Sequence, residues 1–161
     1  FGLGFGQTLY SGVGYGFGFP AISASYEYGL KEIPMGADLN GVISVGGFIG
    51  WKNTPYQLGG WGNTKLVYNS YMISARGNYH FIFHEKFDTY AGIHLGYSII
   101  SSKWKNDDGT FSNFFTTQSG GFVGGGYVGG RYYFNDNLAV YAELGWMLAI
   151  LHLGVAYQFY K

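Results

Sequence analysis

Apolar and polar residues alternate one by one along most of this chain, and no other feature constrains the fold as strongly. Tyr71, Ile73 and Ala75 lie on one side of this alternation, and Ser74 and Arg76 lie on the other. A period of two residues is that of a β-strand, whose successive side chains point to opposite faces. A helical stripe with a period of 3.6 residues is almost absent. The sequence therefore predicts an all-β fold.

The alternation divides the chain into eight segments within a single domain that covers residues 1–161. We expect strands near residues 1–10, 21–30, 41–51, 66–83, 88–102, 119–134, 138–147 and 151–160. We expect longer links at Ser11–Pro20, Lys31–Asn40, Lys52–Thr64 and Lys103–Gln118. Tight polar links follow the fourth and sixth strands. Strands joined by alternating short and long links are typical of an up-and-down barrel.

The composition of the second face of each strand distinguishes a membrane barrel from a soluble sandwich. This face is rich in Gly, Ser and Asn and lacks the charged coat of a solvated sheet. Charged residues make up 11% of the chain, against ~25% in a typical soluble domain, and Gly accounts for 29 of 161 residues. We therefore predict a closed, eight-stranded, antiparallel, up-and-down transmembrane β-barrel with a side-chain-filled lumen. A soluble sandwich would show the same alternation with its apolar face inward.

Aromatic residues cluster at the two ends of the predicted strands. One group lies beside the short turns and the C-terminus, namely Tyr26, Tyr28, Tyr79, Phe81, Tyr132, Phe134 and Phe159. The other lies at the opposite strand ends, namely Trp51, Tyr68, Tyr97, Phe122 and Trp146. Aromatic rings favour membrane interfaces, so two bands are expected on either side of a spanning slab.

Two stretches resemble a known family. Arg131–Gly145 resembles the last periplasmic turn and seventh strand of small outer-membrane barrels, and Leu153–Phe159 resembles their C-terminal insertion signal. The family includes OmpX-like and OmpA-barrel-like proteins and, more closely, uncharacterised barrels of Bacteroidota. The resemblance implies a location in the cell outer membrane and, for most members, no known activity. The insertion signal it implies consists of Leu153, Val155, Tyr157 and Phe159.

Five ionisable residues fall on the face predicted to line the lumen. They are Glu27, Arg76, His94, Arg131 and Glu143. Such groups could form a proton or ion path. The alternative is structural, because buried charges must be paired and an eight-stranded interior is just wide enough to be filled by side chains. We favour the structural interpretation, which predicts a plugged barrel.

The sequence contains no motif for catalysis, cofactors or metals. Cysteine is absent, and the histidines do not show the spacing of a ligand pair. Some barrels modify lipid A, but the His-x-Ser pair of the deacylase type does not occur here. The net charge of zero argues against nucleic acid as a partner. We expect a protein that is not an enzyme, without cofactor, and since it opens on Phe1 we expect a mature or partial chain.

Three functions remain open at this point. The first is a small non-enzymatic outer-membrane protein with a structural or adhesive surface-contact role. The second is an accessory subunit docked on a larger outer-membrane transport or assembly complex, and the third, less favoured, is a lipid A-modifying enzyme. The apolar hairpin tip offers Leu148, Ile150 and Leu151 as candidate partner contacts. In all three cases we expect outer-membrane lipid around the barrel, periplasmic termini and extracellular long loops.

Overall fold

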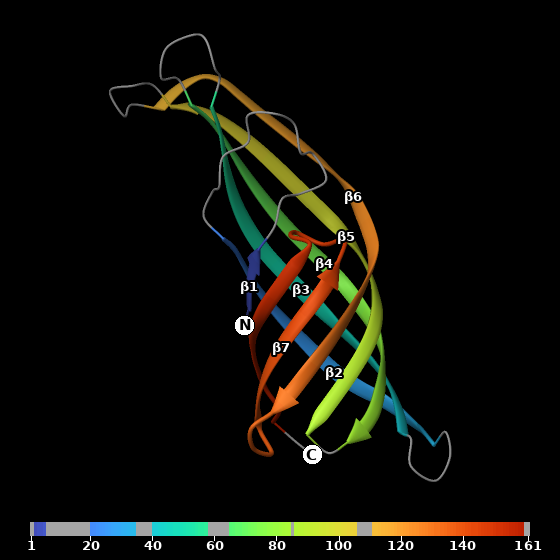
Figure 1. Cartoon of the computed structure of the whole chain (residues 1–161). Helices are drawn as coiled ribbons and strands as arrows, with labels where there is room; N and C mark the ends of the chain where they lie inside the picture. The colour runs from blue at the N-terminus through green and yellow to red at the C-terminus, as the bar shows by residue number, and fades with distance from the viewer. Residues whose placement is uncertain are drawn as a thin grey trace.

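The computed structural model describes residues 2–5, 20–34, 40–57, 65–84, 86–105 and 111–159 of the chain. The eight strands are β1 (Gly2–Phe5), β2 (Ala21–Pro34), β3 (Asn40–Gln57), β4 (Lys65–His84), β5 (Phe87–Lys105), β6 (Phe111–Tyr133), β7 (Leu138–Gly145) and β8 (Leu151–Tyr157) (Figure 1). No helix among the described residues is long and apolar enough to cross a membrane.

Each strand pairs antiparallel with the next, and β1 also pairs with β8. Leu3 lies between Ile22 of β2 and Leu153 of β8, so the first strand joins the two ends of the sheet into a closed barrel. The antiparallel ladder satisfies the backbone polar groups of neighbouring strands. The prediction of an all-β antiparallel fold is confirmed.

The two faces of the sheet have the reverse polarity of a soluble domain. Ile93 on β5 is 72% exposed, whereas Arg76 on the neighbouring strand is 3% exposed. The exposed apolar side chains come from strands all around the sheet and include Tyr26, Tyr28, Ile49, Ile73, Ile93, Leu95, Phe122, Val128, Leu144, Val155, Tyr157 and Phe159. The buried polar ones include Ser44, Ser74, Arg76, Asn78, His80, Asp88, His94, Glu143 and His152. Polar groups therefore fill the inside and apolar groups cover the outside.

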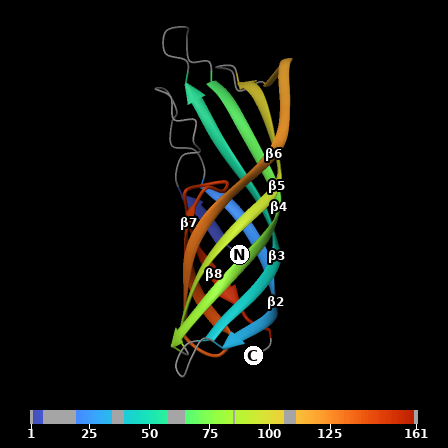
Figure 2. The ribbon, with the colours of Figure 1, turned by 90° about the vertical axis from the view of Figure 1, so that its right-hand side faces the viewer.

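Five strands, β2 to β6, are longer than the sequence predicted. β3, β4, β5 and β6 continue as a sheet beyond the ends of β1, β7 and β8 (Figures 1 and 2). The links expected at Lys52–Thr64 and Lys103–Gln118 are thus partly strand. Polar residues such as Lys52, Asn53 and Thr54 follow one another here, so the sequence lacks the apolar–polar alternation of a strand although the backbone pairing continues.

The link predicted at Lys31–Asn40 is also shorter than expected. β2 continues to Pro34 after an irregularity in its pairing with β3 between Gly29 and Lys31. The remaining parts of the predicted first strand (6–10) and of the long links (11–19, 35–39, 58–64 and 106–110) lie outside the described residues.

The tip of the last hairpin folds inward, which corrects the prediction that Leu148 is a surface contact. Leu148 is 3% exposed and belongs to a buried cluster with Ala21, Phe48, Met72 and Ala149. The tip turns without Gly or Pro because backbone bonds hold it, from Gly145 N–H to the Ile150 carbonyl at 2.9 Å and from Trp146 N–H to the Gly126 carbonyl at 3.1 Å. Burying Leu148 removes its apolar surface from solvent. Of the other candidate contacts, Ile150 is exposed and Leu151 is half-buried.

The outer aromatic bands follow the prediction except at one residue. Tyr68 lies on the same face of β4 as Met72 and Ser74, by the alternation of that strand, so it does not belong to an outer band. Tyr71, which is 49% exposed, lies outside instead and pairs across strands with Trp51. The error arose because the end of a predicted strand was used as a proxy for its outer face.

Two inward glycines accommodate the largest rings of the interior. A Cβ atom at Gly92 would lie 2.6 Å from Cζ of Tyr127, and one at Gly129 would lie 2.6 Å from Cζ of Tyr90. Both contacts are shorter than atoms tolerate, so each ring occupies the space that a side chain would need. The glycine runs of β6 thus fit close packing in the lumen.

We expect Gly129→Val to lower the free energy of unfolding by ~1–3 kcal/mol, because the new side chain would displace the Tyr90 ring. The control is Gly77→Ala, since a Cβ there meets no atom within 4 Å. It should change stability by no more than about 0.5 kcal/mol. Urea unfolding in detergent micelles measures both. Equal midpoints for the two variants would show that Tyr90 does not need the space above Gly129.

Candidate functional site

Arg76 of β4 lies at the centre of the lumen and binds across it to two carboxylates. Its Nη2 atom donates to Oε1 of Glu143 on β7 at 2.6 Å and lies 3.5 Å from Oε1 of Glu27 on β2. The side chains of Arg76 and Glu143 are 1% and 3% exposed. Two charges this deeply buried are stable only as a pair that is also hydrogen-bonded. Arg76 therefore links three strands through the interior.

Arg131 of β6 forms the second guanidinium centre. Its Nη2 atom donates to Oε2 of Glu27 at 2.5 Å, and its Nη1 atom lies 3.8 Å from Oδ2 of Asp88. Glu27 thus lies between Arg131 and Arg76. The same carboxylate serves both cations, so the two centres form one network.

His80 and Asp88 extend this network toward the β4–β5 turn. Nδ1 of His80 lies 2.9 Å from both carboxylate oxygens of Asp88, and Nε2 lies 2.9 Å from Oγ of Ser44. Nε2 also lies 3.7 Å from Oε2 of Glu27. The network thus contains three carboxylates, two guanidiniums and one imidazole.

Two tyrosines hold the guanidiniums in place. The Arg76 guanidinium lies 4.4 Å from the ring centre of Tyr127 and donates from Nε to its hydroxyl at 2.6 Å. The Arg131 guanidinium lies 4.6 Å from the ring centre of Tyr90, whose hydroxyl donates to Glu143 at 2.7 Å. The Tyr127 hydroxyl donates in turn to the amide oxygen of Asn78. Cation–π contacts and charge-assisted hydrogen bonds thus add to the ion pairs.

The structure brings together four of the five residues predicted for the lumen network, namely Glu27, Arg76, Arg131 and Glu143. His94 is buried but lies outside the network: its Nε2 is 2.5 Å from the carbonyl oxygen of Trp146, and its Nδ1 has no hydrogen-bond partner. His94 faces the lumen as expected, but at the height of the hairpin tip. A strand pattern gives the face of a residue and not the level at which it meets the opposite wall.

The network also contains four residues that the sequence did not single out, namely His80, Asp88, Tyr90 and Tyr127. The alternation does place three of them on the inner face. Asp88 and Tyr90 lie an even number of residues from His94 on β5, and His80 lies an even number from Arg76 on β4. His80 lies near the end of β4, close to the turn that leads to β5. The pairing of His80 with Asp88 across the hairpin shows that this position still lies inside the barrel.

The charged groups of the lumen are held in place by one another. In the described part of the chain, His, Asp and Glu form no group of three or more that could hold a metal ion. The carboxylates of Glu27, Asp88 and Glu143 are engaged by arginine, histidine or tyrosine. His152 is fully buried and its ring lies edge-on to Phe48, with a centroid distance of 5.8 Å. The four residues of the predicted insertion signal, from Leu153 to Phe159, all lie on the exposed face.

No family model and no curated protein matches this chain. Two solved structures of Ail, the attachment invasion locus protein of Yersinia pestis, are similar to it. One, in complex with the heparin analogue sucrose octasulfate, has 16% sequence identity and a TM-score of 0.43, and the other has 15% identity and a TM-score of 0.44. Each match covers 91% of this chain and 94% of the Ail chain. These values do not show a shared family, and the expected closeness to barrels of Bacteroidota is unsupported.

We expect Arg76→Met to lower the free energy of unfolding by ~3–5 kcal/mol, because it leaves buried Glu143 without its cation. The matched control is Lys31→Met on β2, which removes an equally long cation from an exposed position. The double variant Arg76→Met/Glu143→Gln should recover part of the loss, since no unpaired charge remains. Chemical unfolding in micelles compares the three. Similar midpoints for Arg76→Met and Lys31→Met would rule out a stabilising network.

Proposed function

We propose that this chain is a non-enzymatic β-barrel of the cell outer membrane that acts as a surface-contact protein. The lumen is filled, the outer face is in contact with lipid, and the part of the sheet that extends beyond the barrel meets a partner protein. Periplasmic termini and extracellular long links belong to the same proposal.

The outer face supports the membrane location. A closed sheet leaves no unpaired edge in lipid, and apolar side chains cover the outside. On β4 the outward rings of Tyr71 and Tyr79 lie eight residues apart along the strand. At ~3.3 Å per residue and a tilt of ~40°, they are separated by ~20 Å along the barrel axis. That separation is close to the ~25 Å height of the apolar band of such barrels.

The contents of the interior support the proposal that the lumen is filled by side chains and is not a path for solutes. The ion-paired network around Arg76 fills the lower part, and the cluster of Leu148 with Phe48 and Met72 covers it on the side of the hairpin tip. Charged side chains bound to one another and an apolar cap leave little room for a water-filled channel.

The main observation in support of a contact role is the open edge of β6. β6 comprises Phe111–Tyr133, but it pairs with β7 only over Tyr127–Tyr133. Within residues 111–126, Phe111, Ser112 and residues 117–126 pair with β5 on one side, and no strand in the described ranges pairs with their other side. An open strand edge is a template for another strand, and proteins use it in recognition by strand addition.

The backbone direction at this edge follows from one hydrogen bond. The Gly126 carbonyl accepts from Trp146 N–H on the β7 side. Since backbone groups alternate in direction along a strand, those of Gly124, Phe122 and Gly120 point to the same side. The edge therefore offers donors and acceptors at every second residue.

The C-terminal strand supports an assembly role for Leu153, Val155, Tyr157 and Phe159. Their side chains form one exposed apolar row on the outside of β8 and just beyond it. We include this row in the proposal as the signal by which the barrel is inserted. Of the three hairpin-tip residues proposed as contacts for a larger complex, Ile150 is exposed, Leu151 is half-buried and Leu148 is buried.

A transmembrane barrel should require detergent for solubility and should migrate differently on gels before and after boiling, because the closed sheet resists detergent until it is heated. Circular dichroism should show β-structure before heating. A chain that stays soluble and monomeric without detergent would overturn the membrane location. Steady porin-sized conductance in planar bilayers would overturn the filled lumen.

The contact role is tested by Gly120→Pro, which removes one amide donor from the open edge while leaving the bonds to β5. The matched control is Gly120→Ala, which adds the same Cβ near Tyr97 but keeps the amide. We expect cells carrying the proline variant to lose attachment to a protein-coated surface, and cells carrying the alanine variant to keep it. Surface levels of both barrels are measured in parallel. Unchanged attachment with proline would contradict recognition through this edge.

A further inference from the structure

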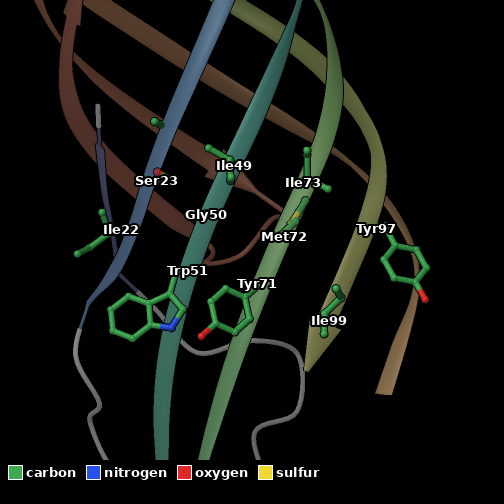
Figure 3. Close-up of a pocket in the computed structure, with 11 residues that line it drawn as sticks. Ile22, Ser23, Ile49, Gly50, Trp51, Tyr71, Met72, Ile73, Tyr97 and Ile99 are labelled. Carbon is green, nitrogen blue, oxygen red and sulfur yellow. The ribbon is translucent and has the colours of Figure 1, made fainter. Parts of the chain in front are cut away.

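An apolar groove lies on the outer face of the barrel across β2, β3, β4 and β5. It has a volume of about 480 Å³, within the range of ~300–1,000 Å³ that is usual for small-molecule sites. Trp51 and Tyr71 lie side by side in it, and Tyr97 lies apart from them beyond Ile73 (Figure 3).

The register of the strands builds the groove from two adjacent rows of outward side chains. One row consists of Ile22, Trp51, Tyr71 and Ile99, which are cross-strand partners from β2 to β5. The next row consists of Ala24, Ile49, Ile73 and Tyr97, paired in the same way. Ala24 is the smallest side chain of the two rows. It leaves space between the larger groups at the β2 end of the groove.

The lining has the chemistry of a hydrocarbon site with a weakly polar border. The side chains of the two rows are almost entirely carbon, with the indole nitrogen of Trp51 and the hydroxyls of Tyr71 and Tyr97 as polar groups, and Ser23 adds one more hydroxyl to the lining. None of the lining residues carries a charge. The nearby cations Arg76 and Lys52 are buried on the opposite face of the sheet. The described groove therefore offers nothing to bind a phosphate.

The groove is continuous with the exposed apolar face on the side of Ile49 and Ile73, whereas the next row beyond Trp51 and Tyr71 is polar and contains the pair Asn53 and Asn69. Ile73, Ile49 and Tyr97, which line it, are themselves 63%, 59% and 40% exposed. A ligand can therefore enter the groove from the apolar side of the outer face. A flexible hydrocarbon chain fits this continuity, because it can enter sideways and fill an irregular hollow.

We propose that the groove holds one acyl chain of a phospholipid as a resident ligand, with its ester region beside Trp51 and Tyr71. This inference rests on the proposed membrane location. It goes further because a resident lipid occupies one place and exchanges slowly, whereas lipid around a barrel in general is mobile. The rings of Trp51 and Tyr71 suit the ester region, since they combine an apolar body with a hydrogen-bonding group.

Native mass spectrometry of the detergent-purified barrel tests the proposal after exposure to a phosphatidylcholine. Wild type should keep one phospholipid through detergent exchange. Ala24→Phe, which fills the groove, should reduce the bound fraction about tenfold, or ~1.4 kcal/mol. Ala75→Phe is the control, because Ala75 lies on the same outer face of the barrel but not in the groove. This control should bind like wild type.

A second measurement locates the lipid in reconstituted vesicles. With Trp51 as the sole tryptophan, phosphatidylcholine brominated on its acyl chain should quench its fluorescence more strongly in wild type than in Ala24→Phe. The proposal is wrong if wild type carries no lipid, if Ala24→Phe keeps it, or if the bound mass is that of lipid A or a protein. Heat-dependent migration of each variant reports folding separately. If wild type shows no difference in gel migration before and after heating, the result would instead count against the proposed membrane barrel.

Discussion

The pairing of guanidinium and carboxylate groups inside a closed sheet is the interaction on which the rest of this structure depends. Arg76 binds Glu143 and Arg131 binds Glu27, and both pairs join strands that are distant in the sequence. A slip of one residue in any of these strands would turn a charge toward the apolar outside. Since an unpaired buried charge costs several kcal/mol, the network selects one register for β2, β4, β6 and β7. The outer rows of side chains are fixed as a consequence.

The alternation of residues predicts the faces of the barrel well, because it follows from the geometry of a strand. It placed Arg76 and Glu143 inside and Ile93 and Leu95 outside, as the structure has them. It does not predict which inward groups meet. Contacts across the lumen depend on the tilt of the strands and on the offset between partners, which a single sequence does not contain. His94 and Asp88 illustrate this limit: they share one face of β5, yet His94 binds the carbonyl of Trp146 and Asp88 binds His80.

The strand ends were harder to predict than the faces, for a related reason. The apolar–polar alternation ends near Trp51, where several polar residues follow one another, although β3 continues to Gln57. The hairpin tip presented the opposite difficulty. Trp146 to Leu151 is a uniformly apolar run, and the sequence alone gave no sign that Leu148 would be buried and Ile150 exposed. Packing against Phe48 decides this, and Phe48 lies a hundred residues before Leu148 in the chain.

The unequal lengths of neighbouring strands connect the architecture to the proposed role. β6 has 23 residues and β7 has 8, so β6 extends far beyond its neighbour on one side. The short β7–β8 hairpin lets its tip fold over the lumen, where Leu148 completes the apolar cap. The same shortness leaves the backbone of β6 without a described partner strand above Gly126. A hairpin as long as β5 and β6 would satisfy that edge but would hold its tip away from Phe48 and Met72. Sealing the lumen from the tip and exposing a strand edge are therefore two results of one feature, the short final hairpin. This feature favours a function on the outer surfaces of the protein rather than through its interior.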